Sequence, residues 1–290
     1  MRRAIGQYLR IDVSPHSVSV QRVSRWRLAG RADAPAQEGA ATVTAAATAT
    51  ATATAAAAAS GTAGVLATQT ITPSADHPVD AIAHALRALL GELDVAGWPV
   101  SFILADELTR MWRVTPPPGA ARMADLEAAA GLRFQSLYGE PPAAWQLSAD
   151  WNATQPFFAA AIPRTLLAAL SVVAQDCKLP IVAIEPRFVS VWNRSRRSLK
   201  PGAWYGHVHD NLLTLAATEA GGKQLRAIRP LPIPPGADHA WLTQMLQREA
   251  LLLDMPAPSL LQVNGSAPAA WTRPVASAAH IPCATVGSAS

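Results

Sequence analysis

A short polar break between two apolar runs near the N-terminus brings together residues that could handle phosphate. The stretch 11-IDVSPHSVSV-20 places the Asp12 carboxylate before the break and the Ser14 and Ser17 hydroxyls within it. Backbone N–H groups at such a turn can bind phosphate, and glycine lets the backbone approach the ligand closely. Here Ser14 is followed by Pro15, which has no N–H group. Three interpretations stay open: a phosphate cradle, the remnant of one, or a strand-end turn in which Asp12 caps local amides.

Two further pairs of side chains have spacings that catalytic or metal sites use. His207 and His209 lie two residues apart on an expected strand, so their rings share a face, as zinc ligands often do. No third ligand is identifiable from spacing, and we interpret both histidines as structural. Asp106 and Glu107 end the apolar run 99-PVSFILAD-106, where a carboxylate pair can serve acid–base chemistry. We interpret this pair as a solvated turn.

Composition excludes several classes of protein. The 290 residues are 50% hydrophobic and 15% charged, with a net charge of +4, so a large core is expected and no nucleic-acid partner. The densest basic run, 194-RSRRSLK-200, is interpreted as a solvated loop. Cys177 and Cys283 lie far apart without a CxxC motif, which favours a reducing compartment. No signal-peptide pattern and no apolar run of about 20 residues is present, so we expect a cytoplasmic location.

The order of expected elements indicates a duplication. An Ala/Thr-rich tract at 34–64 is expected to be a disordered insertion, because its small side chains bury too little surface to offset the ordering entropy. Around it, apolar periodicity predicts three strands, a helix and a strand at 7–13, 17–28, 65–72, 78–97 and 99–106. The same order is predicted again at 203–209, 211–220, 223–233, 238–254 and 259–265.

The segment between the two copies has a different pattern. It predicts helices and strands at 122–139, 144–150, 156–163, 164–178, 180–186 and 187–198. We therefore expect an α/β fold with four parts: a first lobe at 1–118, an inserted α+β subdomain with a linking helix at 119–200, a second lobe at 201–270 and a flexible tail at 271–290.

This plan resembles the ribonuclease-H-like fold of the actin-like ATPase superfamily, with two duplicated lobes. The middle segment is similar to an insertion in the actin-like assembly proteins of type IV pili and in the cytoplasmic part of the related type II secretion component. The phrases that carry the likeness are 158-FAAAIP-163, 179-LPIVAIEP-186 and 192-WN-193. The resemblance spans about residues 5 to 265, outside the Ala/Thr tract.

The resemblance implies a nucleotide site that is eroded here. Asp12 matches the family's first phosphate loop, but Ser14 stands where the family has glycine, and Ser17 completes the turn. In the second loop, Asp210 is displaced from the expected aspartate position, and no glycine follows it. Of the double glycine that holds adenosine in the family, Gly265 is retained. These five residues are the expected remnant of the site. We expect no cofactor, although weak binding of magnesium and ATP stays open.

The resemblance also implies a function. It favours a non-catalytic assembly or scaffold protein of a pilus or secretion apparatus, peripheral to the inner membrane through a membrane partner. Arg110, Trp112 and Arg113, within 110-RMWRVTPPPG-119, are the predicted partner-binding residues. One alternative is an active magnesium-dependent ATPase or phosphotransferase of the same fold, with Asp12 positioning the metal. Another is an interaction domain that belongs to no such machine.

Overall fold

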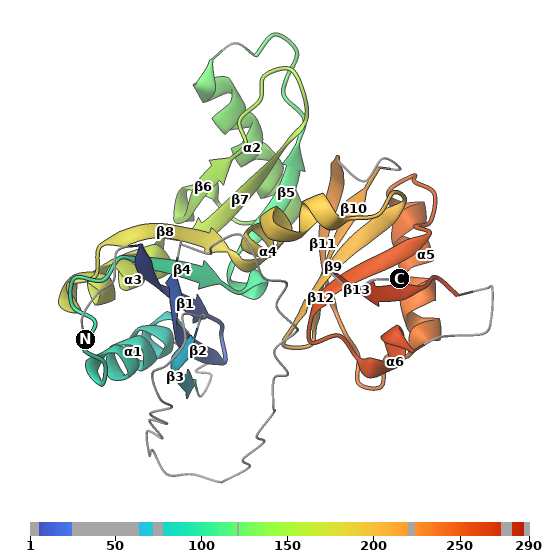
Figure 1. The fold of residues 1–290 in the computed structure, drawn as a ribbon. Coiled ribbons are helices and arrows are strands. Elements are labelled where there is room, and N and C mark those ends of the chain that lie inside the picture. The colour runs from blue at the N-terminus through green and yellow to red at the C-terminus, as the bar shows by residue number, and fades with distance from the viewer. Residues whose placement is uncertain are drawn as a thin grey trace. The chain divides into compact units, whose positions relative to one another are not determined.

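The part of the chain that the structure describes forms three β-sheets (Figure 1). The structure, a computed structural model, describes residues 6–24, 64–71, 78–120, 122–219, 224–273 and 280–286. The predicted insertion at 34–64 lies outside these ranges except for Gly64. Contacts divide the chain into two compact units, one made of Met1–Ile103 and Ala169–Ile184, the other of Leu104–Ala168 and Glu185–Ser290.

The first sheet has the strand order β3-β2-β1-β4-β8. Its strands are β1 (Gln7–Val13), β2 (Ser17–Ser24), β3 (Gly64–Thr70), β4 (Val100–Leu104) and β8 (Ile181–Pro186). Two helices belong with it, α1 (Pro78–Gly91) and α3 (Arg164–Asp176). Alternate residues of β1 and β2 point into the core, and Leu9, Ile11 and Val20 are fully buried.

The second five-stranded sheet has the order β11-β10-β9-β12-β13. Its strands are β9 (Ala203–His209), β10 (Leu212–Thr218), β11 (Leu225–Pro232), β12 (Leu260–Gly265) and β13 (Cys283–Thr285). The helices α5 (His239–Leu252) and α6 (Ala269–Thr272) accompany it. In both sheets the first four strands have the spatial order third, second, first, fourth, which confirms the predicted duplication.

A third, three-stranded sheet forms the inserted subdomain, with the order β5-β7-β6. Its strands are β5 (Arg110–Val114), β6 (Trp145–Ala149) and β7 (Phe157–Pro163), and α2 (Met123–Tyr138) packs on it. The remaining elements are α4 (Arg187–Ser195) and three short 3-10 helices, Asp106–Leu108, Pro142–Ala144 and Arg196–Ser198. No helix in the described ranges has both the length and the apolar character needed to cross a membrane.

The structure moves three of the predicted domain limits. The subdomain begins at β5, whose residues 110–114 were assigned to the first lobe, because β5 pairs antiparallel with β7. Conversely, residues 181–184 of β8 and most of α3 belong to the first unit and not to the insertion, because β8 joins the first sheet. The predicted tail at 271–290 contributes β13, which pairs with β12, and the fully buried Trp271.

Candidate functional site

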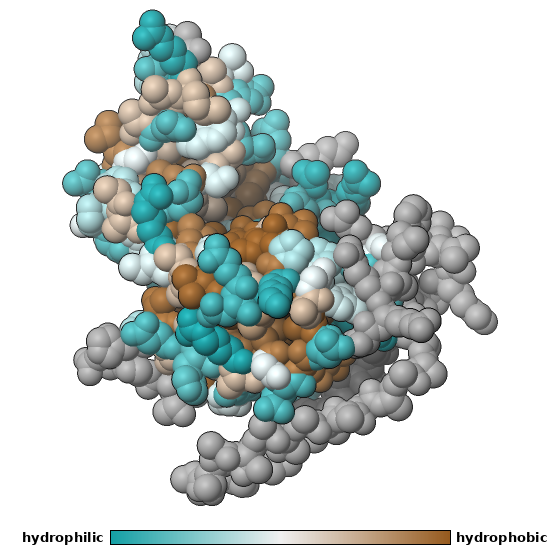
Figure 2. Space-filling model, turned by 90° about the vertical axis from the view of Figure 1, so that its left-hand side faces the viewer, coloured by the Kyte–Doolittle hydropathy of each residue, from teal (hydrophilic) through white to brown (hydrophobic). Residues whose placement is uncertain are grey.

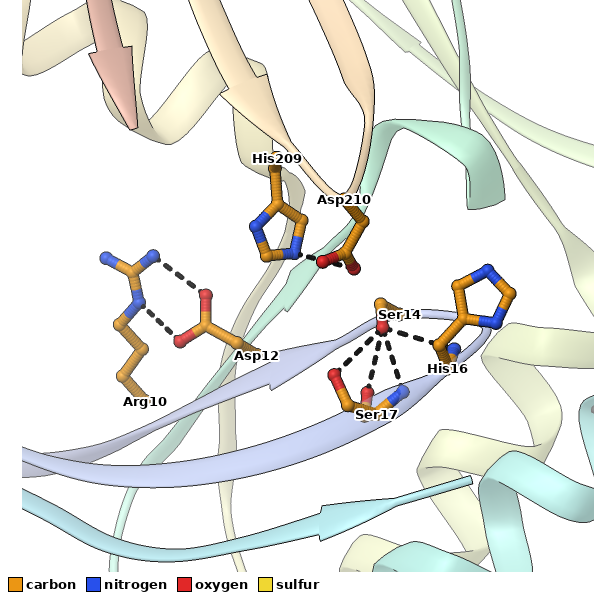
Figure 3. A network of polar contacts seen from close by, with 7 residues as sticks. All are labelled: Arg10, Asp12, Ser14, His16, Ser17, His209 and Asp210. Atoms are coloured by element: carbon orange, nitrogen blue, oxygen red, sulfur yellow. Dashed lines mark hydrogen bonds and ion pairs between the residues drawn. The ribbon is translucent and has the colours of Figure 1, made fainter. Parts of the chain in front are cut away.

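The first hairpin turn uses its backbone donors internally. The Ser14 hydroxyl oxygen accepts hydrogen bonds from the backbone N–H groups of His16, at 3.2 Å, and Ser17, at 2.9 Å. The N–H of Ser14 donates to the carbonyl of Ser17 at 2.9 Å, and Pro15 has none to donate. Figure 3 shows the Ser14 hydroxyl at the centre of these contacts. The amides that would face a phosphate are therefore already satisfied by the turn itself.

The Asp12 carboxylate is held by an arginine of its own strand. Its two oxygens lie 2.8 and 3.0 Å from the guanidinium of Arg10, a two-pronged ion pair that Figure 3 also shows. Residues two apart on a strand share a face, so β1 brings the two side chains together. The Asp12 carboxylate thus already has a cationic partner on its own strand. Arg10 was missed in the sequence, although its charge and its spacing from Asp12 are visible there.

The second hairpin is a two-residue turn. Asp210 and Asn211 both have positive φ angles, 47° and 60°, as a type I′ turn requires between β9 and β10. The Asp210 carboxylate lies 3.1 Å from Nε2 of His209 (Figure 3). This turn is a tight strand connection and not the glycine-rich loop of a phosphate site.

Gly265, the retained glycine, is required by strand packing. Its φ is 91°, and a Cβ at this position would overlap the backbone carbonyl of Val208 on the adjacent strand β9. The N–H of the next residue, Ser266, donates to that carbonyl at 3.1 Å. Only a residue without a side chain fits this close approach, which explains Gly265 without a nucleotide.

His207 and His209 stack with ring centroids 6.3 Å apart. Burial, and then the positive charges of Arg187 and His209, lower the pKa of His207 to about 4. His207 is therefore neutral at physiological pH. Among the described residues, no group of three or more His, Cys, Asp or Glu side chains is placed to hold a metal ion.

Asp106 is a buried anchor, and its interpretation as part of a solvated turn was wrong. Its carboxylate accepts hydrogen bonds from the N–H of Phe188 at 3.0 Å and from the hydroxyl of Thr214 at 2.7 Å. Burial raises the pKa of Asp106 despite these bonds. Burial also raises the pKa of Glu107 next to it, and the negative charges of Asp106 and Asp210 add to that shift. Asp106 thus ties the first turn of α4 to β10.

The three predicted partner-binding residues divide between the two faces of β5. Trp112 is 3% exposed and packs in an aromatic cluster with Phe134, 5.1 Å away between ring centroids. The Arg110 guanidinium lies 5.4 Å from the ring centroid of Trp145 and reaches Glu140 at 3.8 Å. On the opposite face, burial and the nearby positive charge of Arg226 lower the pKa of Arg113. Contact with a partner is thus open to the two arginines, and Trp112 supports the strand.

Sequence comparisons with protein-family models and with curated proteins found no match. Solved structures do resemble the chain. The cytoplasmic domain of EpsL, an inner membrane component of the type II secretion system of Vibrio cholerae, aligns with a TM-score of 0.51 and 12% identity, over 90% of this chain and 83% of that one. A Bacteroides thetaiotaomicron protein with an actin-like ATPase fold and unknown function aligns with a TM-score of 0.52, 12% identity and the same coverage.

A chain of the PilM–PilN type IV pilus biogenesis complex also aligns, with a TM-score of 0.50 and 11% identity, over 90% of this chain and 81% of that one. At these identities the likeness concerns the fold. It agrees with the duplicated sheets and the inserted subdomain described above, and it confirms the predicted resemblance at that level. The chain therefore has an actin-like ATPase fold, similar to that of the EpsL cytoplasmic domain and of the PilM–PilN complex.

Proposed function

We propose that this chain is a non-catalytic assembly or scaffold protein of a pilus or secretion apparatus, which docks to an inner-membrane partner from the cytoplasm. The likeness to EpsL and to the PilM–PilN complex supports the assembly role. One observation carries the non-catalytic part: the Ser14 hydroxyl occupies the backbone amides of His16 and Ser17.

The electrostatic argument against a nucleotide follows from the first hairpin. A bound triphosphate loses its hydration and needs N–H donors or cations in return. At this turn Pro15 has no donor, and the amides of His16 and Ser17 would have to leave Ser14. The positive charge of Arg10 also offsets the negative charge of the Asp12 carboxylate, which weakens its attraction for a metal ion. Moving the two amides from Ser14 to a phosphate replaces existing bonds and so contributes little net binding free energy.

Magnesium-ATP is expected to leave the melting temperature of the protein unchanged. A ligand at about one hundred times its Kd stabilises by about 2.7 kcal/mol, which would raise the melting temperature of a chain of this size by about 4 °C. Differential scanning fluorimetry with millimolar magnesium-ATP measures the shift. In the double variant Ser14→Gly and Pro15→Gly, the turn loses its internal acceptor and gains an amide. Magnesium-ATP is expected to raise the melting temperature of this double variant above that of the same variant without nucleotide.

The opposite result would support the active ATPase or phosphotransferase. In that case magnesium-ATP would clearly raise the melting temperature of the unmodified protein, and Asp12→Ala would abolish the increase.

Capture experiments test the partner. Affinity purification from the native bacterium, followed by mass spectrometry, is expected to recover an inner-membrane pilus or secretion component. Because Arg110 and Arg113 lie on opposite faces of β5, single alanine variants tell which face the partner meets. The variant on that face is expected to reduce recovery about tenfold, as a charged contact of about 1.4 kcal/mol would.

Arg133→Ala is the matched control, since Arg133 is an exposed arginine on α2 of the same subdomain. Melting temperatures of all three variants separate lost binding from lost folding. If no envelope component is recovered, or if both β5 variants retain full recovery, the proposed docking fails.

A further inference from the structure

The first sheet ends at β8, whose outer edge no described strand covers. In the part of the chain that the structure describes, β8 has β4 as its only neighbour in the sheet. The carbonyl of Pro180, just before β8, accepts a hydrogen bond from the N–H of Val100 at 2.9 Å, so it points toward β4. Successive backbone groups of a strand alternate in direction. The N–H and C=O groups of Ile181 and Ala183 therefore point away from β4, to the outside of the sheet.

Apolar side chains surround this open edge. Ile181 and Val182 are 39% and 54% exposed, and Val172 of the preceding helix α3 is 45% exposed. Figure 2 shows hydrophobic side chains gathered on the face that carries these elements. At the other edge of the same sheet, β3 exposes one large apolar side chain, Val65. Among the described edge strands, β8 alone has two consecutive exposed large apolar residues.

The features that usually keep sheet edges apart lie only at the two ends of β8. Natural edge strands carry lysines, a proline or a bulge within the strand to block pairing with another chain. The sequence of β8 is Ile-Val-Ala-Ile-Glu-Pro, with its proline at the last position, and Pro180 precedes the first. The four central residues 181–184 contain no proline and no charge, so their outward backbone groups can pair with a further strand. An edge of this kind accepts an added strand through its backbone hydrogen bonds.

Charges at the two ends of β8 favour a second copy of this same strand. Lys178 lies just before β8, and Glu185 lies near its end. In an antiparallel pair related by a two-fold axis near Val182, the start of each strand lies beside the end of the other, which brings each Lys178 near the partner's Glu185. The neighbouring Asp176 has a partner of its own, Arg87, at 3.3 Å.

We propose that β8 is a dimerisation edge, at which two copies of this chain join their first sheets into one continuous sheet. The interface is isologous, meaning that the same residues serve on both sides. Its apolar part is made by Ile181 and Val182, with Val172 flanking it, and its polar part by the Lys178 and Glu185 pairs. This inference concerns a surface distant in sequence from the hairpin turns and does not depend on the proposed assembly role.

Sedimentation velocity over a range of protein concentrations tests the dimer. The unmodified chain is expected to pass from monomer to dimer as its concentration rises to about 100 µM, by mass action. Val182→Lys places a charge on the apolar edge and is expected to raise the dimer Kd at least about tenfold. Val65→Lys is the matched control, because it makes the same change at the other edge of the same sheet, and it is expected to leave the Kd unchanged.

Charge reversal distinguishes this interface from non-specific hydrophobic association. Lys178→Glu and Glu185→Lys are each expected to weaken the dimer, and the double variant is expected to restore it. These side chains lie at the ends of the strand, so the test remains valid if Val182→Lys fails to fold. A chain that stays monomeric at about 100 µM would overturn the proposal. So would equal loss in Val65→Lys and Val182→Lys, or a double charge variant no tighter than the single ones.

Discussion

Gly265→Ala is expected to destabilise the second lobe severely, by roughly 3 kcal/mol or more, whether or not a nucleotide is present. The added methyl group would overlap the carbonyl of Val208 and sit at a φ of 91° that L-residues rarely adopt. To relieve the overlap, β12 must move away from β9, which weakens their parallel pairing. Urea denaturation, followed by circular dichroism, measures the change in the free energy of unfolding.

Gly236→Ala separates the two causes of this effect. Gly236 also has a positive φ, 74°, but a Cβ there meets no atom within 4 Å. Its substitution should therefore cost only the conformational strain, about 1 kcal/mol. If the two variants lose the same stability, close packing against Val208 is not the reason for glycine at position 265, and a ligand-binding role for Gly265 regains support.

Trp112→Ala is expected to cost about 3–5 kcal/mol in the free energy of unfolding of the inserted subdomain. The indole packs against Phe134 and Tyr138, with ring centroids 5.1 and 6.1 Å away. Truncation leaves a cavity between β5 and α2, the two elements that this cluster joins. Hydrogen exchange of the α2 amides, together with denaturant unfolding, measures the loss.

Leu132→Ala provides the comparison for this variant, since Leu132 is a large apolar residue on α2 that is 70% exposed. It should change the stability by no more than about 0.5 kcal/mol. An opposite pattern is equally informative. If Trp112→Ala keeps full stability but abolishes partner recovery, Trp112 is a contact residue, as the sequence suggested. The aromatic cluster then contributes little to the stability of the subdomain.

The strands and helices of the two lobes could be predicted from the sequence because the spacing of apolar residues within each element is a local property. In β1 and β9 the apolar residues follow the spacing of a strand, and the helices between the third and fourth strands of each lobe have helical spacing. Two strands were missed, β5 and β13. They have five and three residues and carry little local pattern. Their conformation depends on pairing with β7 and β12, which the sequence places far away.

The candidate site was predictable only in part. The pair of Arg10 and Asp12 could have been found from its spacing on one strand. The burial of Asp106 could not, because its partners Phe188 and Thr214 lie 82 and 108 residues away in the chain. The burial of Trp112 was likewise not predictable from local sequence. The face of β5 that carries Trp112 is covered by α2 and by other strands of the third sheet, which lie elsewhere in the chain.

Sequence patterns alone predicted the repeated order of elements, the separate middle segment and a first turn that has no glycine and in which Pro15 lacks an amide donor. These features are readable because composition and periodicity are properties of neighbouring residues. The hydrogen bonds that the remaining groups make could be seen only in the folded chain. In the folded chain the amides of His16 and Ser17 donate to the Ser14 hydroxyl. Among the described strands of the first sheet, β8 lies at the edge. Hydrogen-bond partners and burial are set by which segments meet in space, and local patterns do not contain that information.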